Sequence, residues 1–295
     1  MVSMNRLSAE RRAQVVAALV EGNSIRATVR MTGVAKNTVA KLLVDLGTAC
    51  AEYQDGAMQD LNCERIQCDE IWAFCYAKAK NVPEEHQDEY GYGDVWTWVA
   101  IDADTKLVPS YLVGDRSDED GWAFLTDLAS RLATLPQITT DGLGAYARFV
   151  PRIFGSDVDF AQQRKQYVSN PDHKYSPPTY RTVETIVRNG DPDPAHILTS
   201  YVERQNLTIR MGMRRFTRLT NAFSKKVENL TAAVSLHFMH YNFCRVHQSL
   251  TLTGPDGERT KRTPAMTAGI ADHVWTVQEL CELLGPSASQ APVSN

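Results

Sequence analysis

The sequence contains no run of about 18 uninterrupted apolar residues, so we expect no transmembrane helix. Its first twelve residues are charged without a following apolar core, which argues against a secretory signal. Six cysteines occur without C-x-x-C spacing, and this favours buried, reduced thiols over a zinc site or a disulfide framework. No internal repeat is present. With 43% hydrophobic and 22% charged residues, the chain is expected to be globular and not disordered.

The formal net charge of −4 is unevenly distributed along the 295 residues. Residues 1–47 carry a net +4, residues 48–202 a net −12, and residues 203–226 a net +6. Basic segments favour contact with a polyanion. The acidic middle is compatible with a metal-binding centre or with an ordinary soluble surface.

Residues 1–47 have the pattern of three short helices. Ser8 and Ser24 are suitable N-caps for the first two, and Gly33 makes a turn before a third helix at about 35–46. This pattern predicts a helix-turn-helix module whose third helix enters the DNA major groove, although trihelical bundles that bind no DNA are also common. The residues predicted to contact bases or phosphates are Lys36, Asn37, Thr38 and Lys41.

Residues 63–247 read as an α/β domain that follows a linker or short helix at 48–62. Strands are predicted at 65–76, 95–101, 107–113, 137–140 and 158–168, and helices at 117–135 and 146–154. The order β-β-β-α-β-α-β-α is that of an RNase H-like core, an α/β layer architecture. Such a core places its first and fourth strands side by side and parallel.

The remaining segments are less regular. Residues 169–196 are rich in proline and polar residues and are predicted to form an irregular insertion, with room for a short helix or strand at 181–188. Helices are expected from 197 to about 216 and from 221 to 247. A C-terminal extension at 248–284 and a disordered tail at 285–295 complete the prediction.

Three acidic residues stand where an RNase H-like layout would gather them. Asp69 lies inside the first strand, Asp141 follows the fourth, and Glu203 lies in the first turns of the long helix. A carboxylate within an apolar strand is unfavourable unless it is paired or metal-bound. Three hard oxygen donors suit Mg²⁺ or Mn²⁺, and two such ions can activate water or a DNA 3′-hydroxyl. Each acid alone could equally be a solvated or capping carboxylate.

Other polar residues have more ordinary interpretations. Strand alternation is expected to turn Glu70 away from Asp69, so we rank it well below Asp69. Asp102 and Asp104 suit a turn, and Asp118, Glu119 and Asp120 suit a helix start. The roles of His173 and His196 stay open, and His237, His240 and His247 are expected to pack or cap. The tryptophans Trp72, Trp96, Trp98 and Trp122 are predicted to be core residues, with one left as a candidate for stacking on a base.

The long helix from 197 has two faces. Asn206, Arg210 and Arg214 follow Glu203 at helical spacing, and we predict that they hold DNA phosphates beside the metal ions. An ordinary solvated basic face is the alternative. The opposite face is predicted to pack inward through Val202, Ile209, Met213 and Phe216.

Three sequence blocks resemble those of DDE transposases: CDEIWAF at 68–74, TTDGLGAY at 139–146, and the block from Tyr201 to Glu228. The last is most similar to the insertion-sequence-1 family in its E-R-Q-N-L-x-x-R and A-F-S-K-K. The resemblance implies an RNase H-like core, an N-terminal helix-turn-helix, and the catalytic, metal-binding triad Asp69, Asp141 and Glu203. The cysteine zinc motif that members often carry ahead of the helix-turn-helix is not present in residues 1–47.

The expected function is therefore that of a transposase. It would bind the terminal inverted repeats of an insertion sequence, cleave both ends, and join the 3′-hydroxyl ends to target DNA by metal-dependent phosphoryl transfer. The partner is double-stranded DNA, the assembly a homodimer or higher oligomer, and the location the cytoplasm, at the nucleoid. An RNase H-like nuclease or resolvase, or a non-catalytic helix-turn-helix regulator, remains the alternative. A tyrosine or serine recombinase would need an activated nucleophile that the sequence does not suggest.

Overall fold

The computed structural model describes residues 7–87, 89–168, 179–217 and 221–285 of the chain. Its N-terminal part consists of helices α1 (Ala9–Val20), α2 (Ile25–Thr32) and α3 (Lys36–Ala57). The predicted N-caps are observed: Ser8 accepts a hydrogen bond from the Arg11 amide, and Ser24 accepts one from the Ala27 amide. Gly33 ends α2 in the left-handed conformation, with φ of 68°, which glycine adopts without steric strain.

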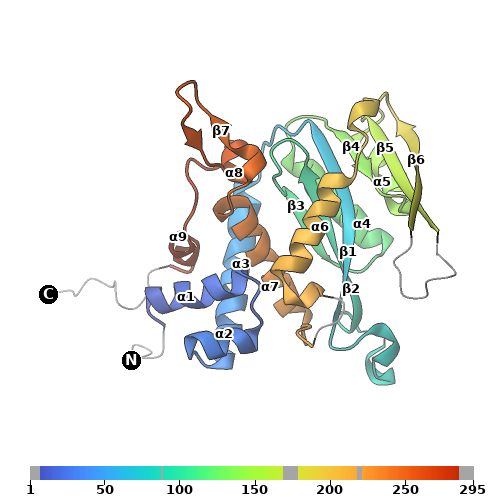
Figure 1. The fold of residues 1–295 in the computed structure, drawn as a ribbon. Helices are drawn as coiled ribbons and strands as arrows, with labels where there is room; N and C mark the ends of the chain where they lie inside the picture. The colour runs from blue at the N-terminus through green and yellow to red at the C-terminus, as the bar shows by residue number, and fades with distance from the viewer. Residues whose placement is uncertain (1–6, 88, 169–178, 218–220, 286–295) are drawn as a thin grey trace.

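Helix α3 is about twice as long as predicted, because it continues to Ala57 instead of ending near residue 46. The segment expected to be a linker or short helix is therefore mostly the second half of α3. Cys50 and Gln54 in this half are buried, and Gln54 donates hydrogen bonds to the Cys50 and Ser235 carbonyls. Helix α3 packs along α7 (Val227–Met239), so one helix joins the N-terminal module to the rest of the molecule (Figure 1).

The centre of the fold is a mixed sheet of six strands in the order β3-β2-β1-β4-β5-β6. The strands are β1 (Arg65–Cys75), β2 (Gly93–Asp102), β3 (Ser110–Gly114), β4 (Gln137–Thr140), β5 (Phe160–Val168) and β6 (Thr179–Asn189). Strand β1 is parallel to β4, and β4 to β5, whereas the other pairs are antiparallel. The predicted side-by-side, parallel arrangement of the first and fourth strands is confirmed.

Helices cover the sheet on both faces (Figure 1). Helices α4 (Asp118–Arg131) and α5 (Gly144–Phe154) lie on one face, where Trp98 packs against Phe124 and Tyr146. Helix α6 (Ser200–Gly212) crosses the opposite face over β1 and β2. Of the four tryptophans predicted to be core residues, Trp98 is fully buried, but Trp122 is 44% exposed because it sits on the outer side of α4.

The structure corrects two predictions in the second half of the chain. Of the helix or strand left open at 181–188 in the predicted irregular insertion, the structure has the strand: β6 is regular, longer than that range, and pairs with β5 at the sheet edge, while residues 169–178 lie outside the described part. The helix from 197 is shorter than predicted: α6 ends at Gly212, Met213 is extended, and residues 214–216 form a 3-10 turn. Arg214 is therefore not on the same helix as Glu203.

The remaining elements are short. They are the 3-10 helices Ala79–Asn81, Glu84–His86, Pro194–His196, Arg214–Phe216 and Gln248–Leu250, the π-helix His240–Cys244, strands β7 (Leu252–Thr253) and β8 (Arg259–Thr260), and helices α8 (Pro264–Thr267) and α9 (Val277–Glu282). The cysteines are free thiols, as predicted. No helix in the described ranges is both long and apolar enough to span a bilayer.

Candidate active site

The end of strand β4 brings two of the predicted acids together. The last paired residues of β1 and β4 are Cys68 and Thr140, so Asp69 and Asp141 are the next residue on each strand. Beyond this pair, β4 no longer borders β1, which leaves space beside Asp69 on that side of the strand. Carboxylate oxygens of Asp69, Asp141 and the adjacent Glu70 all lie within 4.8 Å of one another.

Glu70 belongs to this cluster, contrary to the prediction from strand alternation. Its side chain does start from the opposite face, where it is 1% exposed and accepts a hydrogen bond of 3.1 Å from Arg116 Nη2. Because β4 ends at Thr140, no strand separates the two faces at this point, and the Glu70 carboxylate reaches the Asp141 side. Strand alternation alone did not predict this arrangement, because the sequence does not show where the pairing of β1 with β4 ends.

Glu203 lies beside the cluster but outside the group of carboxylates within 4.8 Å. It stands in the first turn of α6, where its carboxylate is 42% exposed, forms an ion pair with Lys165, and accepts a hydrogen bond of 2.6 Å from the Thr199 hydroxyl. Burial is the main cause of the raised pKa values of Asp69 and Asp141, and the negative charge of Glu203 adds a smaller contribution to both, so Glu203 is close enough to interact with these two acids.

Two side chains fix α6 to strand β1. The Gln67 side-chain oxygen accepts hydrogen bonds from the Tyr201 and Val202 amides at the start of the helix, at 2.9 and 3.1 Å. Asn206 Nδ2 donates to Asp69 Oδ2 at 2.8 Å. Asn206 is only 3% exposed, so it positions an acid of the site and does not stand on an exposed stripe as the sequence predicted.

Burial and crowding raise the pKa values of the acids. Burial, followed by the charge of Asp141, raises the pKa of Asp69 to about 7 and that of Glu70 to about 8. Burial also raises the pKa of Asp141, which the Leu143 amide and the Arg116 guanidinium partly offset. The site therefore carries negative charge that the described side chains compensate only in part, and a cation would be attracted to it.

Because the pKa values of these acids are raised, the stability of the protein should depend on pH. A carboxyl group whose folded pKa lies above its unfolded value stabilises the fold at low pH, and that contribution is lost as pH rises through the folded value. For metal-free protein we expect Asp69→Asn to raise the melting temperature, and by more at about pH 8 than at about pH 5. The measurement is thermal unfolding of wild type and Asp69→Asn in EDTA between about pH 5 and pH 8. If the melting temperature of Asp69→Asn exceeded that of wild type by the same amount at both pH values, ionisation of Asp69 would not cause the increase, and the raised pKa of Asp69 would be contradicted.

Arg116 is a site residue that the sequence did not reveal. Its guanidinium lies 3.9 Å from Asp141 Oδ2 as well as against Glu70, and its carbon Cζ is 4.7 Å from the centre of the Trp96 ring. It follows β3 in a short loop before α4, and no sequence pattern links it to Asp69. Its position lets it neutralise Glu70 while leaving Asp69 available to a ligand.

Several of the other polar residues have ordinary structural contacts. The buried Asp102 accepts hydrogen bonds from the Thr105 amide and hydroxyl in its turn, and Asp104 pairs with Arg65. Asp118 at the start of α4 pairs with Arg148. His196 contacts Arg65 at the opposite end of β1 from Asp69. His173, whose role the sequence left open, lies outside the described residues.

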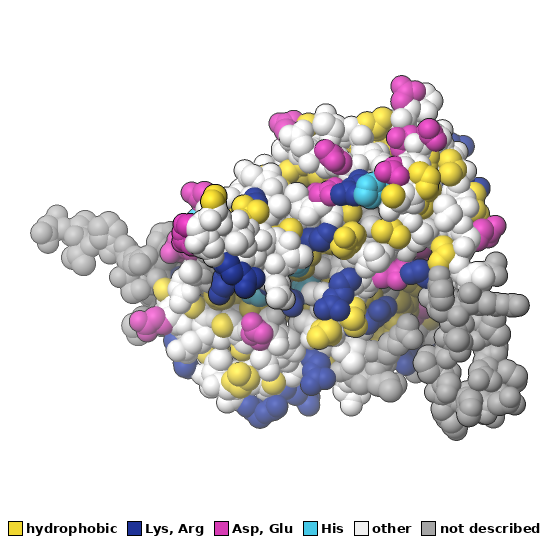
Figure 2. Space-filling view, turned by 45° about the horizontal axis from the view of Figure 1, so that its top comes forward, with side chains coloured by type: hydrophobic (Ala, Val, Ile, Leu, Met, Phe, Trp, Pro, Cys, Tyr) yellow, Lys and Arg dark blue, Asp and Glu magenta, His cyan; other side chains and the backbone are white. Residues whose placement is uncertain are grey.

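The residues predicted to contact DNA lie in two places. Lys36, Asn37 and Lys41 are exposed and Thr38 half-buried on the first turns of α3, where Lys41 pairs with Asp45 at 2.6 Å. Arg210 is half-buried on α6, and Arg214 is exposed in the turn that follows it. Figure 2 shows Lys and Arg side chains gathered toward the middle and lower part of one face, with Asp and Glu mostly toward its upper rim.

One of three comparisons with known proteins agrees with the resemblance read from the sequence. No protein-family model matches the chain. The chain is 25% identical over 162 residues to the insertion element iso-IS1n protein InsB of Shigella dysenteriae, which covers 55% of this chain and 84% of that protein. It also aligns to the crystal structure of the Mos1 strand transfer complex at a TM-score of 0.22 and 11% identity, covering 81% of this chain and 77% of that one. At that score the alignment does not establish a common fold.

Proposed function

We propose that this protein is a transposase that cleaves and joins DNA through a divalent-metal site built on Asp69, Asp141 and Glu203. The observation that carries the proposal is the parallel pairing of β1 with β4, which ends at Cys68 and Thr140 and leaves two carboxylates side by side. The similarity to an insertion-element protein supports the choice of DNA as substrate. The strand order β3-β2-β1-β4-β5 supports an RNase H-like core.

The residues of the site fit a hard divalent cation. Carboxylate oxygens are the donors that Mg²⁺ and Mn²⁺ prefer, and the pKa values of Asp69 and Glu70 are raised by burial and by the neighbouring charge of Asp141, so a bound cation would stabilise their ionised forms. Asp69 and Asp141 would hold the metal, with Glu203 on the exposed side. Bound there, the metal would supply Lewis-acid activation of an attacking oxygen and charge neutralisation at the phosphate.

The chain's own residues have distinct tasks in this reaction. Gln67 and Asn206 hold α6 against β1, and so fix the position of Glu203 relative to Asp69. Lys165 and Thr199 orient the Glu203 carboxylate, and Arg116 holds Glu70. The exposed first turns of α3 would bind the element ends, and Arg210 and Arg214 the DNA near the acids. Joining two ends requires two active sites, so we propose a homodimer or higher oligomer on DNA.

The test is incubation of the full chain with DNA carrying the element ends, in Mg²⁺ or in EDTA, followed by mapping of nicked and joined strands. We expect metal-dependent cleavage at the ends and joining of 3′-hydroxyl ends to target DNA. Cleavage without joining would identify a nuclease or resolvase. Sequence-specific binding with no cleavage in Mg²⁺ or Mn²⁺ would identify a non-catalytic regulator and would overturn the proposal.

A further inference from the structure

The two basic segments of the sequence meet at one cleft. A cavity of about 950 Å³ lies between two parts of the chain. One side is formed by the turn between α1 and α2, by α2 and by the start of α3, and the other by residues 212–215 and 221–226 and by Asn229 on α7. The two sides touch at the cleft: a Cβ added to Gly22 would lie 3.1 Å from the Gly212 carbonyl oxygen at the end of α6. Residues that are far apart in sequence therefore form a single surface.

The lining of this cleft carries only positive charge. Seven Lys and Arg residues and no Asp or Glu contribute to it. They are Arg26, Arg30, Lys36, Arg214, Arg215, Lys225 and Lys226. Within the described part of the chain, none of the seven forms an ion pair with a carboxylate. Seven uncompensated cations repel one another, so the cleft is expected to attract an anion.

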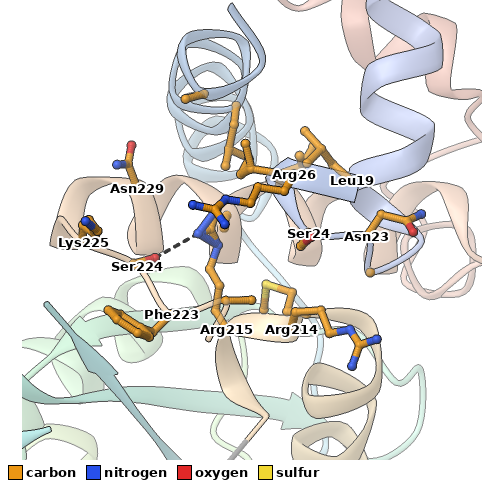
Figure 3. Close-up of a pocket in the computed structure, with 18 of the residues that line it drawn as sticks. Leu19, Asn23, Ser24, Arg26, Arg214, Arg215, Phe223, Ser224, Lys225 and Asn229 are labelled. Carbon is orange, nitrogen blue, oxygen red and sulfur yellow. Dashed lines mark hydrogen bonds between the residues drawn. The ribbon is translucent and has the colours of Figure 1, made fainter. Parts of the chain in front are cut away.

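Arg215 is the clearest sign of an anion site. Its guanidinium donates a hydrogen bond of 2.9 Å to the Ser224 hydroxyl, and burial lowers its pKa. Figure 3 shows its side chain pointing across the cleft toward the guanidinium of Arg26. Arg215 is half-buried, and two guanidinium groups that face each other repel unless a negative group is placed between them.

Two helices also begin at this cleft without a side-chain cap. The first residues of α3, Lys36 and Asn37, line it, and so do Lys226 and Asn229 at the start of α7. Neither helix has a side-chain hydrogen bond at its N-cap, in contrast to α1 and α2, which are capped by serines. Free amides at helix N-termini bind phosphate groups, and they add to the attraction of the seven cations.

The position of the cleft favours a polynucleotide over a small anion. Gly212 at the cleft and Asn206 at the acids stand on the same helix, six residues or about 9 Å apart along its axis. A DNA strand advances about 3.4 Å per nucleotide, so roughly three nucleotides would span that distance. A strand held in the cleft could thus continue along α6 to Asp69.

We propose that this cleft binds the phosphate backbone of a single DNA segment, held jointly by the N-terminal module and the core, with Arg215 as its central anchor. This inference rests on the proposed function, because it takes DNA as the substrate. The added claim is that the N-terminal module and the core form the two sides of one DNA-binding site. Arg26 and Arg30 on one side would act together with Lys225 and Lys226 on the other. Recognition by the module and placement at the acids then depend on the same bound segment.

The test compares two pairs of substitutions, one on each side of the cleft: Arg26→Gln with Arg30→Gln, and Lys225→Gln with Lys226→Gln. All four side chains are exposed, so the folded state is preserved. The matched control is Arg152→Gln with Lys261→Gln, which removes two exposed charges elsewhere on the surface. Binding of a fluorescent duplex of arbitrary sequence is measured against salt concentration for the full chain, and inorganic pyrophosphate is added as a competitor.

We expect each cleft pair to weaken DNA binding and to reduce the slope of log K against log salt by roughly 1 to 2, while the control keeps the wild-type slope. If only one of the two cleft pairs weakened DNA binding and the other bound like wild type, the proposal of a joint site would be overturned. Pyrophosphate that displaces the duplex at equal phosphate concentration would show a small-anion site instead. If the cleft pairs bind and cleave DNA like wild type, the cleft inference fails and the proposed function stands; if wild type binds no DNA, the proposed function itself fails.

Discussion

Replacing Asp141 with Asn is expected to abolish metal-dependent DNA cleavage while leaving DNA binding intact. The side chain follows the end of β4 and lies in the carboxylate cluster with Asp69, so the change removes one negative charge and one anionic ligand. Losing one electrostatic group of a catalytic site typically lowers the rate by roughly a hundredfold to a thousandfold. Asp69→Asn is expected to act in the same way. Single-turnover cleavage of end-bearing DNA measures both.

The matched control for these variants is Asp157→Asn. Asp157 is exposed and contacts only the Ser156 hydroxyl among the hydrogen bonds of the described chain, so its loss should leave the rate unchanged. The Asn variants should also melt at or above the wild-type temperature without metal, because the change relieves repulsion between buried carboxylates. Retained strand transfer in Asp69→Asn or Asp141→Asn would contradict the proposed site.

The same assay decides which carboxylate completes the site. We expect Glu203→Gln to lose activity to a degree similar to Asp141→Asn, because its carboxylate is 42% exposed and faces the side from which DNA would approach. Glu70→Gln should be milder, since the Glu70 carboxylate is 1% exposed and already held by Arg116. The reverse order would exchange the roles of the two residues and would place the metal on the buried side of the cluster.

Local signals in the sequence predicted several of the helix starts and strands of this fold. Ser8 and Ser24 were predicted as N-caps because their side chains can accept hydrogen bonds from backbone amides at a helix start, and both are observed as caps. The predicted bounds of β4, 137–140, match the observed strand, which ends before Asp141 and Gly142. The pairing of β1 with β4 was predicted from the order of elements, because that order is typical of an RNase H-like core, in which the first and fourth strands are adjacent and parallel.

Features that depend on partners distant in sequence were predicted only in part or not at all. At 181–188 the sequence did not decide between a helix and a strand. Strand β6 exposes Val183 and Val187 to solvent, so it has no apolar alternation, and its extended form depends on backbone hydrogen bonds to β5 at the sheet edge. Glu70 enters the site because β4 happens to end beside it. The length of α3 depends on α7, which is nearly 200 positions away and covers the helix beyond residue 46.

The crossing of α3 and α7 has a sequence requirement of its own. Gly47 lies at the point of closest approach, where an added Cβ would come within 2.3 Å of the Ala232 carbonyl oxygen and 2.6 Å of the Ala232 Cα. These are backbone atoms of another helix, so they cannot move aside without separating the two helices. Glycine lowers helix propensity by about 1 kcal/mol relative to alanine, and its presence in the middle of α3 is explained by this contact.

We therefore expect Gly47→Ala to destabilise the protein by roughly 1 to 3 kcal/mol, despite the better helix propensity of alanine. Gly56→Ala is the control on the same helix: nothing lies within 4 Å of its added Cβ, so the change should be neutral or stabilise by up to about 1 kcal/mol. Chemical denaturation of the two variants gives the difference directly. Equal stability of both would mean that α3 does not pack on α7 at Gly47, and that the N-terminal module is not held against the core by this helix. Because the cleft lies between these two parts, a destabilised Gly47→Ala variant should also bind DNA less tightly, whereas Gly56→Ala should bind like wild type.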